Sequence, residues 1–496
     1  MNPPPLTRRQ AVQAASAVGA SLLATESGDD LTLKSAVELV ALMKRRKASA
    51  MEVLDAHLKQ IERVNSKVNA IVTLVPDMAR EAARKADEAI AKKLPLGPLH
   101  GLPIAHKDLQ ETKGIRTTFG SPIFKDNVPT ADSLTVERLK RAGAITLGKT
   151  NTPEWGAGSQ TFNKVFGATR NPYGLTKTCG GSSGGAAASL ATNMLPIADG
   201  SDFGGSLRNP ASWCNVVGFR TCAGRVPQYP KGMGWFGGSV DGPMARSVSD
   251  VALVLSALAG PDARSPLSII EPGSIFARPL GANVKGRRVA WFKDLGGLPF
   301  EKELVDVVNG QRKTFESLGF FVEEAEPDFK DADFAFKTLR AWLSFSTHGE
   351  RWAKDAGLYK ETLRGEIERG SKLSGADIAK AETLKTALYQ RMRVFFERYD
   401  YFVLPVTQVM PFEVTVEYPT SINGVAMTSY IDWMKSCYYI SATGLPAISV
   451  PAGFTASGLP VGLQIVGKQW GEWAVLEAAY AFEQATQFGL KRPAFS

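Results

Sequence analysis

The chain is poor in the residues that build disulfide frameworks and metal centres. Its 496 residues include only four cysteines and four histidines. The cysteines form no Cys-x-x-Cys pair, which excludes a zinc ribbon and a disulfide-stapled scaffold. The histidines are far apart and show no His-Glu-x-x-His spacing, so a helix-borne histidine metal site is not expected. We predict neither a bound metal nor another cofactor.

A strong excess of charge of one sign is also missing. Lys and Arg number 58 against 49 Asp and Glu, and the formal net charge of +9 is small for this length. The basic residues form no dense stripe with interleaved aromatic residues, so nucleic-acid binding is not predicted. Hydrophobic residues make up 44% and charged residues 22%, which is typical of a globular protein and excludes a disordered or fibrous chain.

The first thirty residues differ from the rest. Arg8 and Arg9 precede an uncharged, small-residue run over 11–24, and no acidic residue occurs before Glu26. A charged segment before a short apolar one is typical of an export signal, and paired arginines indicate the twin-arginine route. The run is too short to span a bilayer, which needs about 20 residues, so stable membrane insertion is not expected. We predict a signal and mature N-terminus in residues 1–30 and a periplasmic or secreted protein, with a cytoplasmic one as the alternative.

After residue 30, predicted helices and strands alternate. Ser49 and Glu52 form a capping box in front of an amphipathic helix. Further helices are predicted at 77–93, 301–317, 335–400 and 472–485, and strands at 69–75, 289–292, 320–322, 401–406, 447–450 and 461–466. Strands interleaved with helices of this length favour a layered α/β fold. No internal repeat or long linker is visible, so residues 31–496 are predicted to form a single domain.

Glycine and serine are concentrated in residues 179–227. Cys179-Gly-Gly-Ser-Ser-Gly-Gly185 is followed, after a small-residue run, by Asp202-Phe-Gly-Gly-Ser206. Dense glycines let backbone N–H groups approach a bound molecule closely. A run of such groups that ends on a serine can supply both a nucleophile and oxyanion donors. The alternative is a pair of flexible glycine loops that flank a helix.

A serine nucleophile needs a base, and no histidine lies in this block. His106 and Lys107 are neighbours in an apolar strand over 101–109, where adjacent side chains point to opposite faces and cannot serve the same site. Burial lowers the pKa of a lysine towards values at which it accepts a proton. Taken alone, Lys107 is nevertheless better explained as an ion-paired lysine at a strand end.

Together, these segments resemble the amidase signature family of serine hydrolases. The match is unbroken from Gly180 to Ala211 and includes the segment around Lys107; it also covers residues 148–154, 224–227, 444–453 and 458–462. The resemblance extends over most of the chain from about residue 31. It implies the amidase-signature fold, which is a large mixed central β-sheet covered by helices on both faces, and residues 31–496 would form its catalytic domain.

The resemblance also implies roles for individual residues. Ser206 matches the nucleophile, Ser182 the bridging serine after a cis peptide bond, and Lys107 the base. The backbone N–H groups that would form the oxyanion hole belong to Phe203, Gly204, Gly205 and Ser206, and the supporting residues would be Ser183, Asp202 and Arg208. The expected reaction is hydrolysis of a carboxylic amide to an acid and an amine through an acyl-enzyme. His106 and Cys179 depart from the commoner family pattern, but neither is a triad member.

Three rival functions remain. An amidotransferase-type subunit that delivers ammonia to a partner would share the triad, and the export signal argues against it. A binding protein with a dead site does not fit three intact triad residues. Residues 143–150 satisfy the Gly-x-x-x-x-Gly-Lys-Thr pattern of nucleotide-binding loops, but the predicted helix before them and strand within them are the wrong context.

The expected partner is a small-molecule amide, and the protein would be a monomer or homodimer. Aryl amides, anilides, peptide amides, cyclic amides and carbamates are all candidate substrates. We expect the substrate pocket to draw on residues 335–400 and 410–440. These regions are rich in aromatic residues, among them Trp342, Phe345, Tyr430 and Trp433, of which many will belong to the core.

Overall fold

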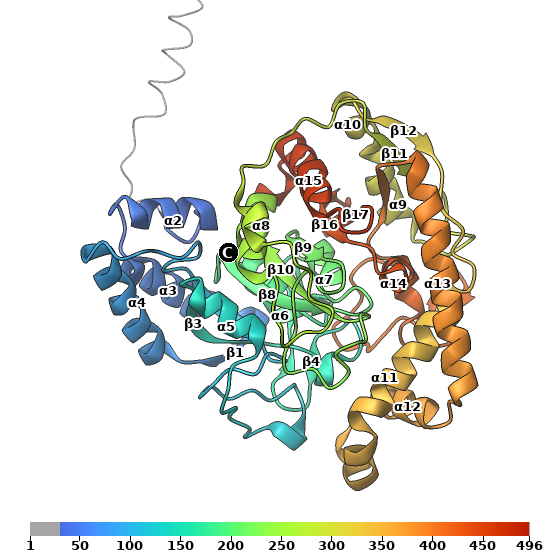
Figure 1. Ribbon diagram of the computed structural model, residues 1–496, viewed down its shortest axis with the longest axis horizontal. Helices are drawn as coiled ribbons and strands as arrows, with labels where there is room; N and C mark the ends of the chain where they lie inside the picture. Colours follow the sequence, from blue (N-terminus) through green and yellow to red (C-terminus); the bar gives the residue numbers. More distant parts are fainter. Residues whose placement is uncertain (1–29, 496) are drawn as a thin grey trace, which may run out of the picture.

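An eight-stranded mixed sheet runs through the molecule (Figure 1). The computed structural model describes residues 30–495, so the predicted export signal lies outside the described residues up to residue 29. The first three strands pair in parallel and the remaining neighbours pair antiparallel. In spatial order the strands are β12 (Phe321–Glu324), β11 (Arg288–Trp291), β13 (Tyr401–Pro405), β17 (Pro460–Val466), β16 (Ala447–Phe454), β9 (Val217–Arg220), β10 (Val240–Ala245) and β8 (Ile197–Asp202).

A smaller sheet continues the large one at its β8 edge. It has the order β1 (Ile71–Leu74), β3 (Ile145–Thr150) and β2 (Pro103–Lys107). Strand β2 lies beside β8, and the backbone N–H of Lys107 donates to Asp199 Oδ1 on β8 at 2.8 Å. The sheet predicted as one large unit is therefore divided in two, because the Asp199 side chain bridges the strands where a backbone ladder would otherwise run. This junction brings Lys107 close to the glycine-serine block.

Helices cover both faces of the large sheet, as predicted. The helices are α2 (Ala36–Lys44), α3 (Ala50–Val68), α4 (Pro76–Ala91), α5 (Leu134–Arg141), α6 (Gly184–Ala191), α7 (Arg208–Trp213), α8 (Val248–Leu258), α9 (Lys302–Gly310), α10 (Arg312–Ser317), α11 (Ala332–Asp355), α12 (Glu361–Ser371), α13 (Gly375–Arg398), α14 (Lys435–Thr443) and α15 (Glu472–Thr486). Helices α6 and α7 pack on one another and on the sheet, whereas α8, α9, α10 and α15 form a second layer (Figure 1). Helices α11, α12 and α13 form a separate helical wall at one side. No helix within residues 30–495 is long and apolar enough to span a membrane.

The local signals in the sequence fix several of these elements. Ser49 Oγ accepts the Glu52 N–H and the Glu52 carboxylate accepts the Ser49 N–H, so the predicted capping box begins α3. The predicted 301–317 helix is interrupted at Gln311, which separates α9 from α10. The predicted 335–400 region divides into three helices, and a second capping box at Ser374 begins the last of them. These breaks turn one predicted helical stretch into a wall of three packed helices.

Candidate active site

Lys107 lies at the end of β2, in a strand whose five residues are all buried. Its Nζ donates to three serine hydroxyls: Ser182 Oγ at 2.7 Å, Ser183 Oγ at 2.9 Å and Ser201 Oγ at 3.0 Å. Burial lowers the pKa of Lys107 to about 7, although negative charges at nearby aspartates, Asp241 foremost, oppose the shift. Because no carboxylate of the described residues pairs directly with it, the ion pair that the isolated sequence favoured is wrong. A lysine with this pKa can hold or release a proton near neutral pH.

The loop that carries Ser182 is held by its carbonyl groups. The Gly181–Ser182 peptide bond is cis, in agreement with the family resemblance. Thr161 Oγ1 donates to Gly180 O at 2.8 Å, and Ser159 Oγ donates to Gly181 O at 2.5 Å. These two anchors fix the backbone from which Ser182 reaches Lys107. The sequence offered no signal for Ser159 or Thr161, because they lie in a loop far from the motif that they hold.

Ser206 follows β8, at the entrance to α7. Its side chain is 8% exposed and, like that of Ser182, lines a cavity of about 190 Å³. The Ser183 N–H donates to the Ser206 carbonyl at 3.2 Å, which ties the two glycine-serine loops together. Ser206 Oγ makes no hydrogen bond to another described residue, so this hydroxyl remains available to a molecule in the cavity. The structure therefore brings the three predicted triad members to one place.

The backbone between Asp202 and Ser206 differs from the expected oxyanion hole at one position. The Gly205 N–H, predicted among the donors, donates to Asp202 Oδ1 at 2.8 Å. This corrects the expectation for Gly205, because a committed N–H is not free for a substrate oxygen. Within the described residues, the N–H groups of Phe203, Gly204 and Ser206 have no protein acceptor. Gly205 instead permits the turn, since its φ of +126° is open to glycine but strained for other residues.

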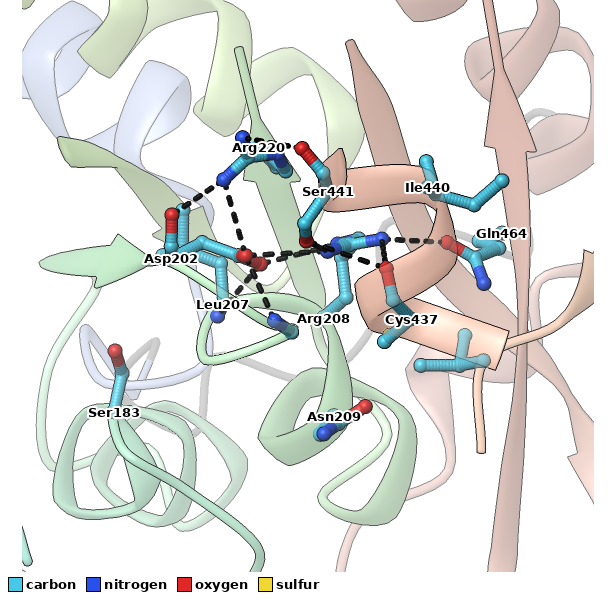
Figure 2. A network of polar contacts seen from close by, with 12 residues as sticks. Ser183, Asp202, Leu207, Arg208, Asn209, Arg220, Cys437, Ile440, Ser441 and Gln464 are labelled. Carbon is cyan, nitrogen blue, oxygen red and sulfur yellow. Dashed lines mark hydrogen bonds and ion pairs between the residues drawn. The ribbon is translucent and has the colours of Figure 1, made fainter. Parts of the chain in front are cut away.

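Asp202 and Arg208 stabilise this turn (Figure 2). The Asp202 carboxylate also accepts the Leu207 N–H at 3.2 Å and pairs with Arg208 Nε at 3.0 Å and Arg220 Nη1 at 3.3 Å. Burial would raise the pKa of Asp202, but the two guanidinium groups outweigh it and hold the pKa well below its usual range. Arg208 further donates to Gln464 Oε1 at 2.8 Å, which joins the turn to β17. The bracing role predicted for this pair agrees with the geometry, while Arg220 was missed because nothing in its local sequence marks it.

His106 faces away from the serines, as strand alternation predicts. Its Nδ1 lies 2.5 Å from Asp199 Oδ2 and its Nε2 lies 2.9 Å from Thr146 Oγ1, all inside the protein. Asp199 thus binds the His106 ring with one oxygen and the Lys107 N–H with the other. The ring fixes the strand that carries Lys107 but does not reach the cavity. Cys179 is also buried and burial raises the pKa of its thiol to about 12, so it stays protonated.

The nucleotide-binding alternative does not fit the structure. Residues 145–150 form strand β3, not a phosphate-cradling loop that leads into a helix. The Lys149 ammonium is buried and donates to Thr112 Oγ1 at 2.8 Å and Thr117 Oγ1 at 3.1 Å. Lys149 is therefore bonded inside the protein and does not point towards a phosphate.

Two adjoining cavities meet at the serines. The 190 Å³ cavity, here called the serine cavity, is lined by Ser182, Ser206 and residues of α11; the adjoining cavity holds about 390 Å³. They share the walls Leu109, Trp155, Ser201, Ser239, Thr347 and His348. Part of the predicted pocket region, residues 335–400, does line the serine cavity, but the 410–440 stretch lines neither. None of the four aromatic residues named above lines either cavity, and Trp433 instead stacks on Trp213 in the core.

The fold and the site define a class of protein. A mixed sheet carrying a buried lysine, hydrogen-bonded to the serine that follows a cis peptide bond, with a second serine in the same cavity, defines a serine hydrolase of the Ser-Ser-Lys type. The amidase family profile matches residues 52–476. The chain belongs to the amidase signature family, and it is a hydrolase of carbon–nitrogen bonds other than peptide bonds.

Individual relatives cover nearly the whole chain. An acylamidase of Rhodococcus erythropolis is 34% identical over 467 residues, which are 93% of this chain and 97% of that protein. A glutamyl-tRNA(Gln) amidotransferase subunit of Moorella thermoacetica is 35% identical over 490 residues, which are 94% of this chain and 99% of that protein. The crystal structure of a bacterial aryl acylamidase superposes with a TM-score of 0.86 at 30% identity and covers 93% of this chain and 99% of that one. Within residues 30–495, no group of three or more His, Cys, Asp or Glu side chains is placed to hold a metal ion.

Proposed function

We propose that the protein hydrolyses small carboxylic amides through an acyl-enzyme on Ser206, with Ser182 and Lys107 as the proton relay. The observation that carries this proposal is the 2.7 Å contact of Lys107 Nζ with Ser182 Oγ, at a lysine whose pKa burial lowers to about 7. A neutral amine in this position accepts the Ser182 proton while Ser182 accepts the Ser206 proton. Ser206 becomes nucleophilic without needing to ionise in advance.

The acylation step proceeds from this relay. Ser206 Oγ attacks the amide carbonyl carbon, and the negative charge moves to the carbonyl oxygen. The unpaired N–H groups of Phe203, Gly204 and Ser206 stabilise this oxygen, because donors aimed at a developing charge act strongly in a water-poor site. The proton then returns from Lys107 through Ser182 to the departing nitrogen. The carbon–nitrogen bond breaks, and the amine leaves the acyl group on Ser206.

Deacylation repeats the relay with water in place of Ser206. Lys107 takes a proton from the attacking water through Ser182, and its return to Ser206 Oγ releases the acid. Ser183 and Ser201 accept hydrogen bonds from Lys107 Nζ and keep the amine aimed at Ser182. In these roles Lys107, Ser182 and Ser206 are catalytic, whereas Ser183, Asp202 and Arg208 position them.

The cavities support an aryl amide as substrate. The adjoining cavity is lined by Phe119, Trp155 and Tyr229, and the Phe119 and Trp155 rings stack at 4.8 Å. Flat apolar walls of this kind suit an aromatic ring. We therefore place an arylamine leaving group in the adjoining cavity and the acyl group in the serine cavity. The names of the acylamidase and aryl acylamidase relatives agree with this assignment.

A panel of amides tests the proposal. Purified protein is offered acyl 4-nitroanilides, aliphatic primary amides, a peptide amide, a cyclic amide and a carbamate at one concentration. We expect the anilides to be cleaved with the highest kcat/KM and Ser206→Ala to cleave none. Turnover by the Ser206→Ala variant equal to that of the wild type would refute the acyl-enzyme on this residue.

A second candidate is an ammonia-producing amidotransferase subunit. The observation in its favour is the 35% identity with the Moorella thermoacetica protein over 94% of this chain. Such a subunit would release ammonia from an amide, and the triad would be unchanged. Hydrolysis of glutamine by the isolated chain, faster than that of any anilide, would favour this candidate over the aryl amidase.

We also propose export by the twin-arginine route, on the strength of Arg8, Arg9 and the uncharged run behind them. The mature protein would then be a single catalytic domain over residues 31–496, acting in the periplasm or outside the cell as a monomer or homodimer. Sedimentation of the mature chain distinguishes these two oligomeric states.

A further inference from the structure

Arg340 projects from α11 into the wall of the serine cavity. It is the only Lys, Arg, Asp or Glu among the described residues that line this cavity, which also holds Ser182 and Ser206. Its guanidinium carbon lies 5.8 Å from the centre of the Phe203 ring, and the Phe203 backbone carries one of the unpaired N–H groups. A permanent positive charge therefore stands beside the place where the substrate acyl group is proposed to bind.

The charge of Arg340 lacks a carboxylate partner. Its one hydrogen bond to a described residue runs from Nη2 to the Tyr430 hydroxyl at 2.6 Å, and its buried Nε has no partner. Glu366 is near enough to act on Arg340 electrostatically, but no oxygen of it comes within 4.0 Å, and Arg369 Nη2 binds its Oε1 at 2.6 Å. Arg340 thus retains guanidinium donors with no acceptor among the described residues.

The other arginines of the site behave differently. Arg208 and Arg220 are completely buried, and both pair with the carboxylate of Asp202. Arginine is always charged, and removing its charge from water without a partner is costly. A guanidinium that faces a cavity without its own carboxylate suits a carboxylate brought by a ligand, because its planar fork matches a carboxylate at two oxygens.

We infer that Arg340 binds a carboxylate on the acyl part of the substrate, so that the preferred substrates are anionic amides such as monoanilides of short dicarboxylic acids. This inference rests on the proposed function, since it places the acyl group in the serine cavity. The free guanidinium donors bind the two carboxylate oxygens, and Tyr430 and Phe203 hold the guanidinium plane in position. The carboxylate forms and breaks no covalent bond; it anchors the acyl chain while Ser206 reacts.

A matched pair of substrates tests the charge alone. N-(4-nitrophenyl)succinamic acid and 4-methylpentanoyl 4-nitroanilide have acyl chains of the same length and branching, but only the first is charged. We expect the wild type to prefer the acid, and the ratio of kcat/KM for acid over neutral anilide to fall about 10- to 100-fold in Arg340→Met, mainly through KM for the acid. Arg340→Lys should keep part of the preference because it keeps the charge but not the fork.

Two further measurements make the test decisive. Arg391→Met is the matched control, because Arg391 Nε donates to the Asp328 carbonyl and lines neither cavity, so the ratio should stay as in the wild type. Calorimetry then measures binding of the acid to Ser206→Ala and to the Ser206→Ala, Arg340→Met double variant; the second should bind at least about tenfold more weakly. An unchanged ratio in Arg340→Met, or equal binding by the two Ser206→Ala proteins, overturns the role of Arg340. Failure of the proposed function would appear separately, as wild-type turnover that survives in Ser206→Ala.

Discussion

Lys107 Nζ and Ser182 Oγ lie 2.7 Å apart where both side chains are almost sealed from solvent, at 0% and 2% exposure. The two residues are 75 positions apart in the chain and come from different elements, β2 and the loop before α6. Burial without a paired carboxylate lowers the pKa of the lysine, and the short contact gives its proton a partner. The proposed mechanism follows from this one relationship.

The nucleophile is tested by removing the Ser206 hydroxyl. Ser206→Ala should lower kcat for an anilide by about 10⁴–10⁶, because the acyl-enzyme cannot form without Oγ. A fluorophosphonate should label the wild type at Ser206, as read by mass spectrometry of peptides, and should leave the variant unlabelled. Ser183→Ala serves as the comparison and should still be labelled at Ser206. A label on Ser183 in the wild type would show that the nucleophile is assigned to the wrong serine.

The pH profile is expected to follow Lys107. Its pKa is lowered to about 7, so the amine is protonated and unable to accept a proton at lower pH. Activity should therefore rise with pH through one ionisation near 7 and level off above it. Lys107→Met should lower kcat by about 10²–10⁴ and remove this ionisation from the profile.

His106 provides the control for that experiment. Its ring faces Asp199 on the other side of β2, so His106→Gln should keep the ionisation near 7 even if some stability is lost. If the ionisation disappears in His106→Gln and persists in Lys107→Met, the base is the histidine and the relay is wrong.

Ser201 is expected to tune the base. Its hydroxyl accepts a hydrogen bond from Lys107 Nζ at 3.0 Å and so favours the charged amine. Ser201→Ala should shift the ionisation in the kcat/KM profile to lower pH and reduce kcat less than Lys107→Met does. Ser239→Ala is a fitting control, because Ser239 lines the same cavity without a hydrogen bond to Lys107. Equal profiles for Ser201→Ala and the wild type would show that this contact does not affect the base.

Asp202 should contribute more to stability than any exposed charge. Asp202→Asn leaves two buried guanidinium groups, Arg208 and Arg220, without a counter-charge, and should lower the free energy of unfolding by about 3–5 kcal/mol. Urea titration followed by circular dichroism measures the change. Asp306→Asn breaks an exposed pair with Lys302 and should have little effect, because solvent screens it. Comparable losses in both variants would contradict the bracing role of Asp202.

Export predicts where the mature chain begins. Protein isolated from its native host should start after the uncharged run, between about residues 21 and 30, because the signal is removed during transport. N-terminal sequencing of the periplasmic or secreted fraction gives the answer. Replacement of Arg8 and Arg9 by lysine should hold the unprocessed chain in the cytoplasm. Intact Met1 on a cytoplasmic wild-type enzyme would contradict export and strengthen the amidotransferase candidate.

Much of this protein could be predicted from its sequence, because the signals concerned are local. The Ser49 capping box began a helix where predicted, and alternation along residues 103–107 correctly separated His106 from Lys107. The glycine-serine motifs also carried the family, since a backbone that turns sharply at Gly205 tolerates few other residues. Such features depend on neighbours within a few residues and can be recognised without knowledge of the fold.

Only the tertiary structure decided how distant segments meet. It paired Lys107 with Ser201 instead of a carboxylate, and it committed the Gly205 N–H to Asp202. It also placed Arg340 in the serine cavity, whereas the aromatic residues chosen from the same region lie elsewhere. A helix has the same sequence whichever face it turns to a cavity, and a buried charge takes its pKa from groups that the chain brings in from far away. Those outcomes depend on packing between elements, which no local pattern records.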